Sequence, residues 1–304
     1  GALALLDAED AARLADVIGA LSLEALTGTP RAFDPRIHAV RPHPGQASSG
    51  RNLARLLEGS GIVESHKDCG RVQDAYSLRC MPQVHGATRD ALAYGRAVLE
   101  REAMSATDNP LVFAERRRVV SGGNFHGQPV AIALDLATIA VAELADISEA
   151  RVDRLTNGHT SGLPPFLSPD AGTHSGFMVA QYTSAALVTE NRLHAFPASV
   201  GSLPTSAGME DHVSMGVHAA HKLAAVVRNT RDALAIEALC AAQGLDLIGA
   251  TTAPGVEEAR RVVREHVPKL ESDRALSPDI ARISDLIGRE VLIAAVRARV
   301  ASLA

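Results

Sequence analysis

Two long apolar segments constrain the fold of this 304-residue chain more than any other feature. The first runs from Gln128 to about Leu155, and the second runs from Val213 to about Leu247. Helices of this length, roughly 25–35 residues, span about 40–50 Å. Apolar residues lie around almost the whole circumference of both segments, so each is buried within a bundle or between subunits. We therefore predict an all-α fold built on two long helices.

Shorter helices are expected around this pair, because alanine and leucine dominate and β-branched runs are short. They are predicted at Ala8–Ala25, with Asp7 as the cap, and at Ala47–Leu57, Thr88–Met104, Phe177–His194 and Asp279–Leu303. Residues 33–46 form a proline-rich connection, and residues 64–85 are mostly loop. A small hairpin of Leu111–Phe113 and Arg118–Val120 is expected after a turn. We find no linker, so residues 1–304 are expected to form one helical body.

Composition excludes several classes of protein. With 46% hydrophobic residues the chain can bury a large core, and its net charge of −5 is spread along the sequence. Lysine and arginine are scattered and only 3% of residues are aromatic, which argues against a nucleic-acid surface. The three cysteines include no C-x-x-C pair, as expected in a reducing, cytoplasmic compartment. No apolar run reaches the ~18 residues of a membrane span.

The sequence gives little support for a metal site or for a catalytic nucleophile. His218 and His221 lie three residues apart and could share a helix face, but no third ligand stands at the right spacing. We therefore expect no metal site. The sequence also lacks the G-x-S-x-G segment of serine hydrolases and the glycine patterns of nucleotide-binding loops.

One polar stretch, Gln73–Gln83, carries three side chains suited to binding an amino acid. Gln73, Tyr76 and Arg79 recur every third residue, so they face the same way if the stretch is a helical turn. Arginine can hold a carboxylate in a bidentate pair, and the tyrosine phenol can donate or accept a proton. The alternative is a solvated helix face with an ordinary surface arginine, and the spacing alone leaves the two interpretations about equal.

Three further polar stretches interrupt the helical frame. Paired glycines before the first long helix precede Phe125, which could form the wall of a pocket, although a simple turn is the alternative. Glu210 and Asp211 are expected in the first turn of the second long helix, where the helix dipole alone would explain them. The functional alternative is that Glu210 faces inward and binds a cationic or hydrogen-bonding ring. We interpret Thr160-Ser161-Gly162 as a structural turn.

Five motifs in this order resemble the aromatic amino acid ammonia-lyases, and the histidine ammonia-lyases most closely. They are QDAYSLRCMPQVHGA at residues 73–87, SATDNPLVF, SGGNFHGQPV, SGLPPFL and MEDHVSMG. The resemblance covers essentially the whole chain. It implies the mainly helical fumarase/aspartase-like fold, a homotetramer, and conversion of L-histidine to trans-urocanate and ammonium. It also implies an electrophilic methylidene-imidazolone ring, formed when an internal Ala-Ser-Gly tripeptide cyclises and loses water.

This sequence departs from the family because it contains no Ala-Ser-Gly. Ala47-Ser48-Ser49-Gly50 has an inserted serine, and Thr160-Ser161-Gly162 lies in the wrong motif. Residues 1–6 read like the interior of a helix. We therefore expect the ring-forming tripeptide, the family's tyrosine base and a substrate-binding histidine to lie upstream of Gly1.

The resemblance assigns roles to five positions. Arg79 matches the anchor of the substrate carboxylate, Tyr76 the phenol beside the electrophile, and Gln73 a hydrogen-bonding support. Phe125 matches a residue that flanks the electrophile, and Glu210 the carboxylate that recognises imidazole or assists proton movement. A buried carboxylate favours an imidazole over a phenyl ring, which would leave it unpaired. A phenylalanine or tyrosine ammonia-lyase or aminomutase remains the alternative enzyme, and a non-catalytic helical scaffold remains the alternative of another class.

Overall fold

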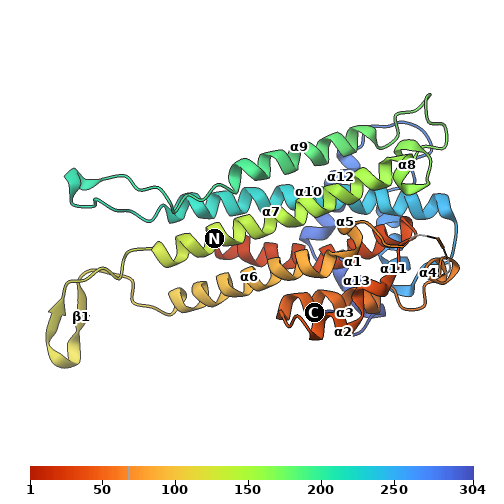
Figure 1. The fold of residues 1–304 in the computed structure, drawn as a ribbon. Coiled ribbons are helices and arrows are strands. Elements are labelled where there is room, and N and C mark those ends of the chain that lie inside the picture. Colours follow the sequence, from red (N-terminus) through yellow and green to blue (C-terminus); the bar gives the residue numbers. More distant parts are fainter. Residues whose placement is uncertain (68, 71) are drawn as a thin grey trace.

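Two parallel long helices form the axis of the molecule in the computed structural model, which describes residues 1–67, 69–70 and 72–304. They are α7 (Gln128–Thr156) and α10 (Gly216–Ile248). Side-chain hydrogen bonds join them along their length, from Thr230 to the Val141 carbonyl and from Arg151 to Glu237. Because these partners keep a nearly constant offset, the N-terminal ends of both helices lie at the same end of the molecule (Figure 1). The prediction of an all-α fold is confirmed.

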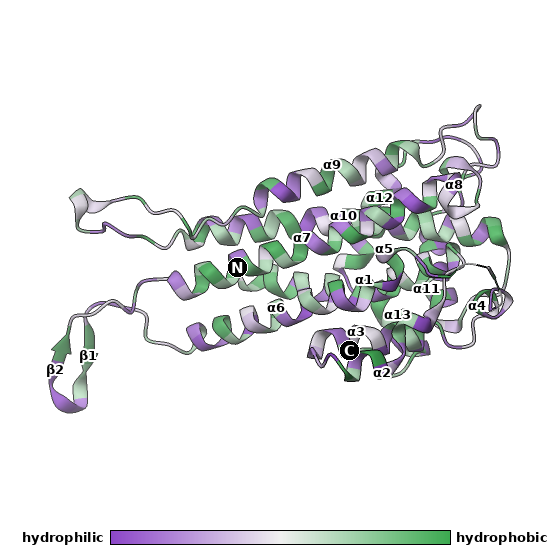
Figure 2. Cartoon of the chain, in the orientation of Figure 1, coloured by the Kyte–Doolittle hydropathy of each residue, from purple (hydrophilic) through white to green (hydrophobic). Residues whose placement is uncertain are grey.

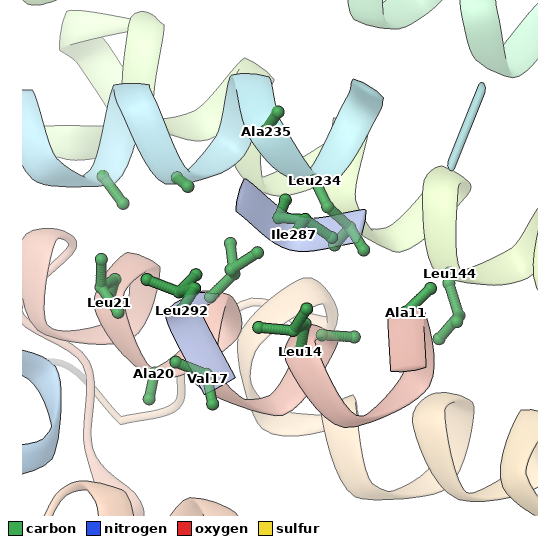
Figure 3. Close-up of a cluster of buried hydrophobic side chains, with 14 of the residues drawn as sticks. Ala11, Leu14, Val17, Ala20, Leu21, Leu144, Leu234, Ala235, Ile287 and Leu292 are labelled. Carbon is green, nitrogen blue, oxygen red and sulfur yellow. The ribbon is translucent and has the colours of Figure 1, made fainter. Parts of the chain in front are cut away.

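Three further helices pack along this pair. They are α1 (Ala2–Ala25), α6 (Met81–Ala103) and α9 (Met178–His194). Leu14, Val17 and Leu21 of α1 lie in the buried core with Leu234 of α10 and Leu292 of α13 (Figure 3). Burial of apolar surface is the main force that holds such helices together, at about 25 cal/mol per Å².

Short elements complete the fold at both ends. The remaining helices are α2 (Pro35–Ala39), α3 (Pro44–Leu56), α4 (Gly61–Ser65), α5 (Tyr76–Arg79), α8 (Gly158–Ser161), α11 (Pro254–His266), α12 (Ser277–Gly288) and α13 (Val291–Arg299). Short 3₁₀ turns lie at Pro30–Phe33, Ala114–Arg116, Pro165–Leu167 and Ser206–Gly208. Figure 1 shows α4, α5 and α8 toward the end of the molecule opposite the hairpin.

The predicted hairpin is confirmed as β1 (Leu111–Phe113) and β2 (Arg118–Val120). The strands are antiparallel, with Leu111 opposite Val120. The hairpin projects beyond the helices, as does the loop that joins α9 to α10 (Figure 1). Both therefore lie at the end where α7 and α10 begin.

Several predicted helix boundaries are wrong. Asp7 does not cap α1, because alanines and leucines before it continue the helix back to Ala2. The stretch predicted as loop contains α5 and the start of α6, which begins at Met81 rather than Thr88. Pro82 fits there because the first turn of a helix leaves its N–H groups unpaired anyway.

The second long helix and the C-terminal segment also differ from the prediction. The helix begins at Gly216 rather than Val213, because Met215 has a left-handed backbone (φ 59°). The segment 279–303 is two helices rather than one, because Glu290 has a left-handed backbone (φ 57°) between them. Helix α11 was not expected, although Pro254 in its first turn and basic residues in its last turn are signals for one.

Apolar side chains also reach the surface of the long helices. Ile132, Leu136 and Ile139 form an exposed row on α7, and Val179 and Tyr182 are exposed on α9. Figure 2 shows that hydrophobic positions recur along the length of α7. Within the described residues, no helix has both the length and the apolar content needed to cross a membrane.

Candidate functional site

Gln73, Tyr76 and Arg79 come together beside one pocket. The guanidinium carbon of Arg79 lies 4.7 Å from the centroid of the Tyr76 ring, one turn apart on α5. Gln73 precedes the helix. Together with Arg79, it lines a pocket of about 510 Å³. Arg31 and Lys67 also line this pocket, so it is rich in cationic groups suited to an anion such as a carboxylate. Tyr76 is 72% exposed and is free to contact a ligand or another chain.

The segment that carries these residues is fixed from both sides. Asp74 accepts a hydrogen bond from the Thr29 backbone N–H at 2.7 Å, just after α1. Leu78 is buried among core residues, so the short helix turns Tyr76 and Arg79 away from the core. Tyr76 and Arg79 are therefore attached to a backbone that the core holds in place.

Phe125 and Glu210 lie in two loops that meet at the other end of the molecule. The rings of His126 and His212 stack with centroids 5.6 Å apart, and the Nε2 of His126 lies 3.0 Å from the His212 carbonyl oxygen. The neighbouring Phe125 is 56% exposed. Two motifs far apart in sequence are thus joined in one loop cluster.

Glu210 lies in the loop before α10 rather than in its first turn. Its backbone forms a bridge with Thr205, and the Thr205 hydroxyl donates to its carboxylate at 2.5 Å. The prediction that it sits in the first turn of the helix is wrong, because α10 starts six residues later at Gly216. The helix dipole therefore does not account for this exposed carboxylate.

A single chain does not bring these two groups together. The Ser77 carbonyl on α5 accepts a hydrogen bond from Arg151, near the C-terminal end of α7. Phe125 lies just before the N-terminal end of the same helix, at Gln128. At 1.5 Å per residue, the 23 residues between Gln128 and Arg151 separate the two groups by about 35 Å. Arg79 and Glu210 of one chain therefore cannot bind the same small molecule.

Neither serine of the two near-matches to Ala-Ser-Gly, Ser49 and Ser161, stands in an open loop suited to cyclisation. Ser49 lies inside α3, is fully buried and donates to Asp16 at 2.5 Å. Ser161 ends α8, and its hydroxyl donates to the Asn157 carbonyl at 3.0 Å. Both hydroxyls serve local structure, in agreement with the interpretation of Thr160-Ser161-Gly162 as a turn.

The sequence analysis missed a buried polar network between α1, α3 and α6. Asp16 accepts hydrogen bonds from Ser49, Asn52 and Arg89, and the Nδ1 of His85 lies 2.8 Å from it. Burial alone would raise the pKa of Asp16, but Arg89 and His85 hold it below its ordinary value. Burial lowers the pKa of His85, although Asp16 opposes this. The charged residues inside otherwise apolar helices were the available signal.

His218 and His221 lie on α10, near its N-terminal end. Among residues 1–67, 69–70 and 72–304, no group of three or more His, Cys, Asp or Glu side chains is arranged to hold a metal ion.

Comparison with known families accounts for the motif order. A family profile described as aromatic amino acid lyase matches residues 1–265. The chain belongs to the aromatic amino acid lyase family. Its likeness to histidine ammonia-lyases is close: it is 57% identical to that of Sorangium cellulosum over 100% of this chain and 60% of the relative. It is 54% identical to that of Gloeobacter violaceus over 98% of this chain and 58% of the relative.

Solved structures show that this aromatic amino acid lyase chain has the family's helical fold. It superposes with a TM-score of 0.91 on histidine ammonia-lyase from Trypanosoma cruzi, at 44% identity, covering 99% of this chain and 57% of the other. Tyrosine aminomutase from Streptomyces globisporus gives 0.93 at 37% identity, covering 99% and 61%. The chain therefore spans about three-fifths of the length of these relatives.

Proposed function

We propose that the protein carrying this chain is a histidine ammonia-lyase, which eliminates ammonia from L-histidine to give trans-urocanate in the cytoplasm. The observation that carries the proposal is the Arg79–Tyr76 pair beside a cationic pocket, in a chain 57% identical to a histidine ammonia-lyase over its whole length. The exposed carboxylate of Glu210 supports histidine over phenylalanine or tyrosine as the substrate.

The site would be shared between chains of a homotetramer. Arg79 and Glu210 lie at opposite ends of one chain, and the exposed apolar row Ile132, Leu136 and Ile139 runs along α7 between those ends. Exposed apolar faces of this kind mark contacts with other proteins. Packing of long helices from several chains would bring α5 of one chain to the Phe125–Glu210 loops of another.

Arg79 and Gln73 would bind the amino acid and set its orientation. A guanidinium pairs with a carboxylate through two parallel N–H···O bonds, which fixes both position and angle. Tyr76 stands one turn from Arg79, so its hydroxyl would lie near the atoms next to the carboxylate carbon. A phenol at that place can donate to or accept from the amino group and so move a proton during elimination.

Glu210 and Phe125 would bind the ring end of the substrate. The Glu210 carboxylate accepts a hydrogen bond from an imidazole N–H, and this bond becomes charge-assisted in the site. A phenyl or phenol ring offers no N–H, so the carboxylate would lose its partner and disfavour those substrates. Phe125 supplies an apolar surface against which a planar ring can pack.

The electrophile would be a methylidene-imidazolone supplied by a segment outside residues 1–304. The described residues suit such a group from elsewhere, because the Tyr76 ring of one chain and the Phe125 ring of another are both exposed and can flank it. When bound, the ring supplies an electron-poor carbon that captures the substrate, so that a weakly acidic β-hydrogen can be removed. The role of this chain is then to orient the substrate by its carboxylate and its imidazole.

The test is product analysis with the natural full-length protein. With L-histidine, L-tyrosine and L-phenylalanine offered separately, we expect urocanate and ammonium from histidine as the main products. Peptide mass analysis should show loss of two water molecules at an Ala-Ser-Gly outside this chain. Cinnamate or coumarate as the main product would support the alternative lyases, and an inactive protein with no dehydrated tripeptide would support the scaffold.

A further inference from the structure

Among residues 1–67, 69–70 and 72–304, Arg151 is the largest side chain that is fully buried, although it carries a charge. It lies on α7 and forms two bonds with Glu237 of α10, Nε to Oε1 at 2.5 Å and Nη2 to Oε2 at 2.9 Å. Ser22 of α1 donates to the same carboxylate at 2.6 Å. Burial of a charge is costly unless the charge is paired and hydrogen-bonded. These three hydrogen bonds therefore offset the cost of burying the Arg151–Glu237 ion pair.

The remaining arginine nitrogen reaches out of this pair to α5. Nη1 of Arg151 donates to the Ser77 carbonyl at 3.2 Å. Ser77 lies between Tyr76 and Arg79 in a helix of only four residues. A single helical turn is not stable alone, because nucleation fixes several backbone angles for very few hydrogen bonds. The helix therefore depends on its anchors, and those within α5 itself include Leu78 in the core and Arg151 at the Ser77 carbonyl.

We propose that Arg151, aligned by Glu237, is a positioning residue that sets the direction of Tyr76 and Arg79 toward the substrate. The proposal rests on the proposed function, because it assumes that these two side chains contact the amino acid. The guanidinium is rigid and planar, so the carboxylate that aligns two of its nitrogens also aims the third at Ser77. Loss of the third bond would let α5 rotate about Leu78 and carry the Tyr76 and Arg79 side chains with it.

Arg264 provides a matched control on another helix, α11, and its acidic partner, like that of Arg151, lies on α10. It pairs with Asp246 of α10 at 2.6 Å, and its Nη1 donates to the Val267 carbonyl at 3.2 Å. As in Arg151, one nitrogen pairs with a carboxylate and another donates to a backbone carbonyl, although the third donates to the Gln243 side-chain oxygen at 3.4 Å rather than to the same carboxylate. Val267 follows α11, and in the described part of the chain these contacts of Arg264 do not involve α5. Replacement of either arginine by lysine keeps the charge and removes the rigid fork.

The experiment compares Arg151→Lys with Arg264→Lys in the natural full-length protein. We expect Arg151→Lys to lower kcat/KM for histidine by about 10²-fold, with a raised KM, because misplacement of about 1 Å costs that much. Arg264→Lys should leave kcat/KM within about twofold while both variants lose stability. Equal kinetic losses in both variants, or wild-type kinetics in Arg151→Lys, would overturn the proposal.

Hydrogen exchange separates this proposal from the proposed function. The Cys80 N–H donates to the Tyr76 carbonyl at 2.9 Å and closes α5. Its exchange should be faster in Arg151→Lys and unchanged in Arg264→Lys, whatever the substrate is. Unchanged exchange in both variants refutes the positioning role even if urocanate forms. If Arg151→Lys fails to fold, the double variant Arg151→Met/Glu237→Met replaces it, because removing both charges leaves no unpaired charge in the core. The double variant should show the same faster exchange of the Cys80 N–H.

Discussion

Two variants that are each inactive should restore activity when they are mixed. Arg79→Ala removes the carboxylate anchor, and Glu210→Ala removes the imidazole partner. Within one chain these residues are separated by about 35 Å of α7, so no site can take both from the same chain. In a mixed oligomer, a site is intact when its α5 comes from the Glu210→Ala chain and its loop cluster comes from the Arg79→Ala chain.

The expected recovery follows from random assembly. With equal amounts of both chains, each of the two contributions is intact in half of the sites, so about one quarter of all sites are complete. The assay is urocanate formation after co-expression, compared with each variant alone. The matched control mixes Arg79→Ala with Tyr76→Phe, both on α5, and should recover nothing because one chain supplies both residues. Recovery no greater than the mean of the single variants would refute the shared site.

Three further predictions test separate parts of the structure. Glu210→Gln should lower kcat/KM for histidine by about 10–100-fold, which is the contribution of a charge-assisted hydrogen bond. Because the side chain is exposed, the free energy of unfolding should change by less than ~0.5 kcal/mol, and a parallel loss of stability in urea unfolding would assign Glu210 a structural role. Burial lowers the pKa of His85 in the folded state, so the unfolded state binds a proton at higher pH and the free energy of unfolding falls as pH drops from 7 to 5. His85→Gln should flatten that decline, and the control His218→Gln, at an exposed position, should not. Gly86→Ala should cost about 1–3 kcal/mol, because its Cβ would collide with the backbone of α3, whereas Gly122→Ala meets no atom within 4 Å and should be neutral in thermal unfolding.

The long helices were predictable because their apolar content is extreme over many turns. The boundaries were not, because single residues decide them. Met215 and Glu290 adopt left-handed backbones that only glycine adopts readily, and nothing local in the sequence predicts them. Asp7 resembles a cap in isolation, yet the apolar residues before it extend the helix past it.

Part of the site was predictable because a local pattern in the sequence carries it. The three-residue spacing of Gln73, Tyr76 and Arg79 predicts one shared direction. In the structure Gln73 and Arg79 line one pocket, and the Tyr76 ring lies against the Arg79 guanidinium. The pairing of Arg151 with Glu237 was not predicted, because 86 residues separate them in sequence. A charged residue within an apolar helix signals that a partner exists, but only the fold shows which one it is.

The account depends on Arg79 of one chain and Glu210 of another binding the two ends of one molecule. A crystal structure of the natural full-length protein with bound urocanate tests this most directly. We predict the carboxylate within hydrogen-bond distance of an Arg79 guanidinium and an imidazole nitrogen within that distance of a Glu210 carboxylate from a different chain. Urocanate bound in a cavity that one or both of these side chains do not reach would contradict the account.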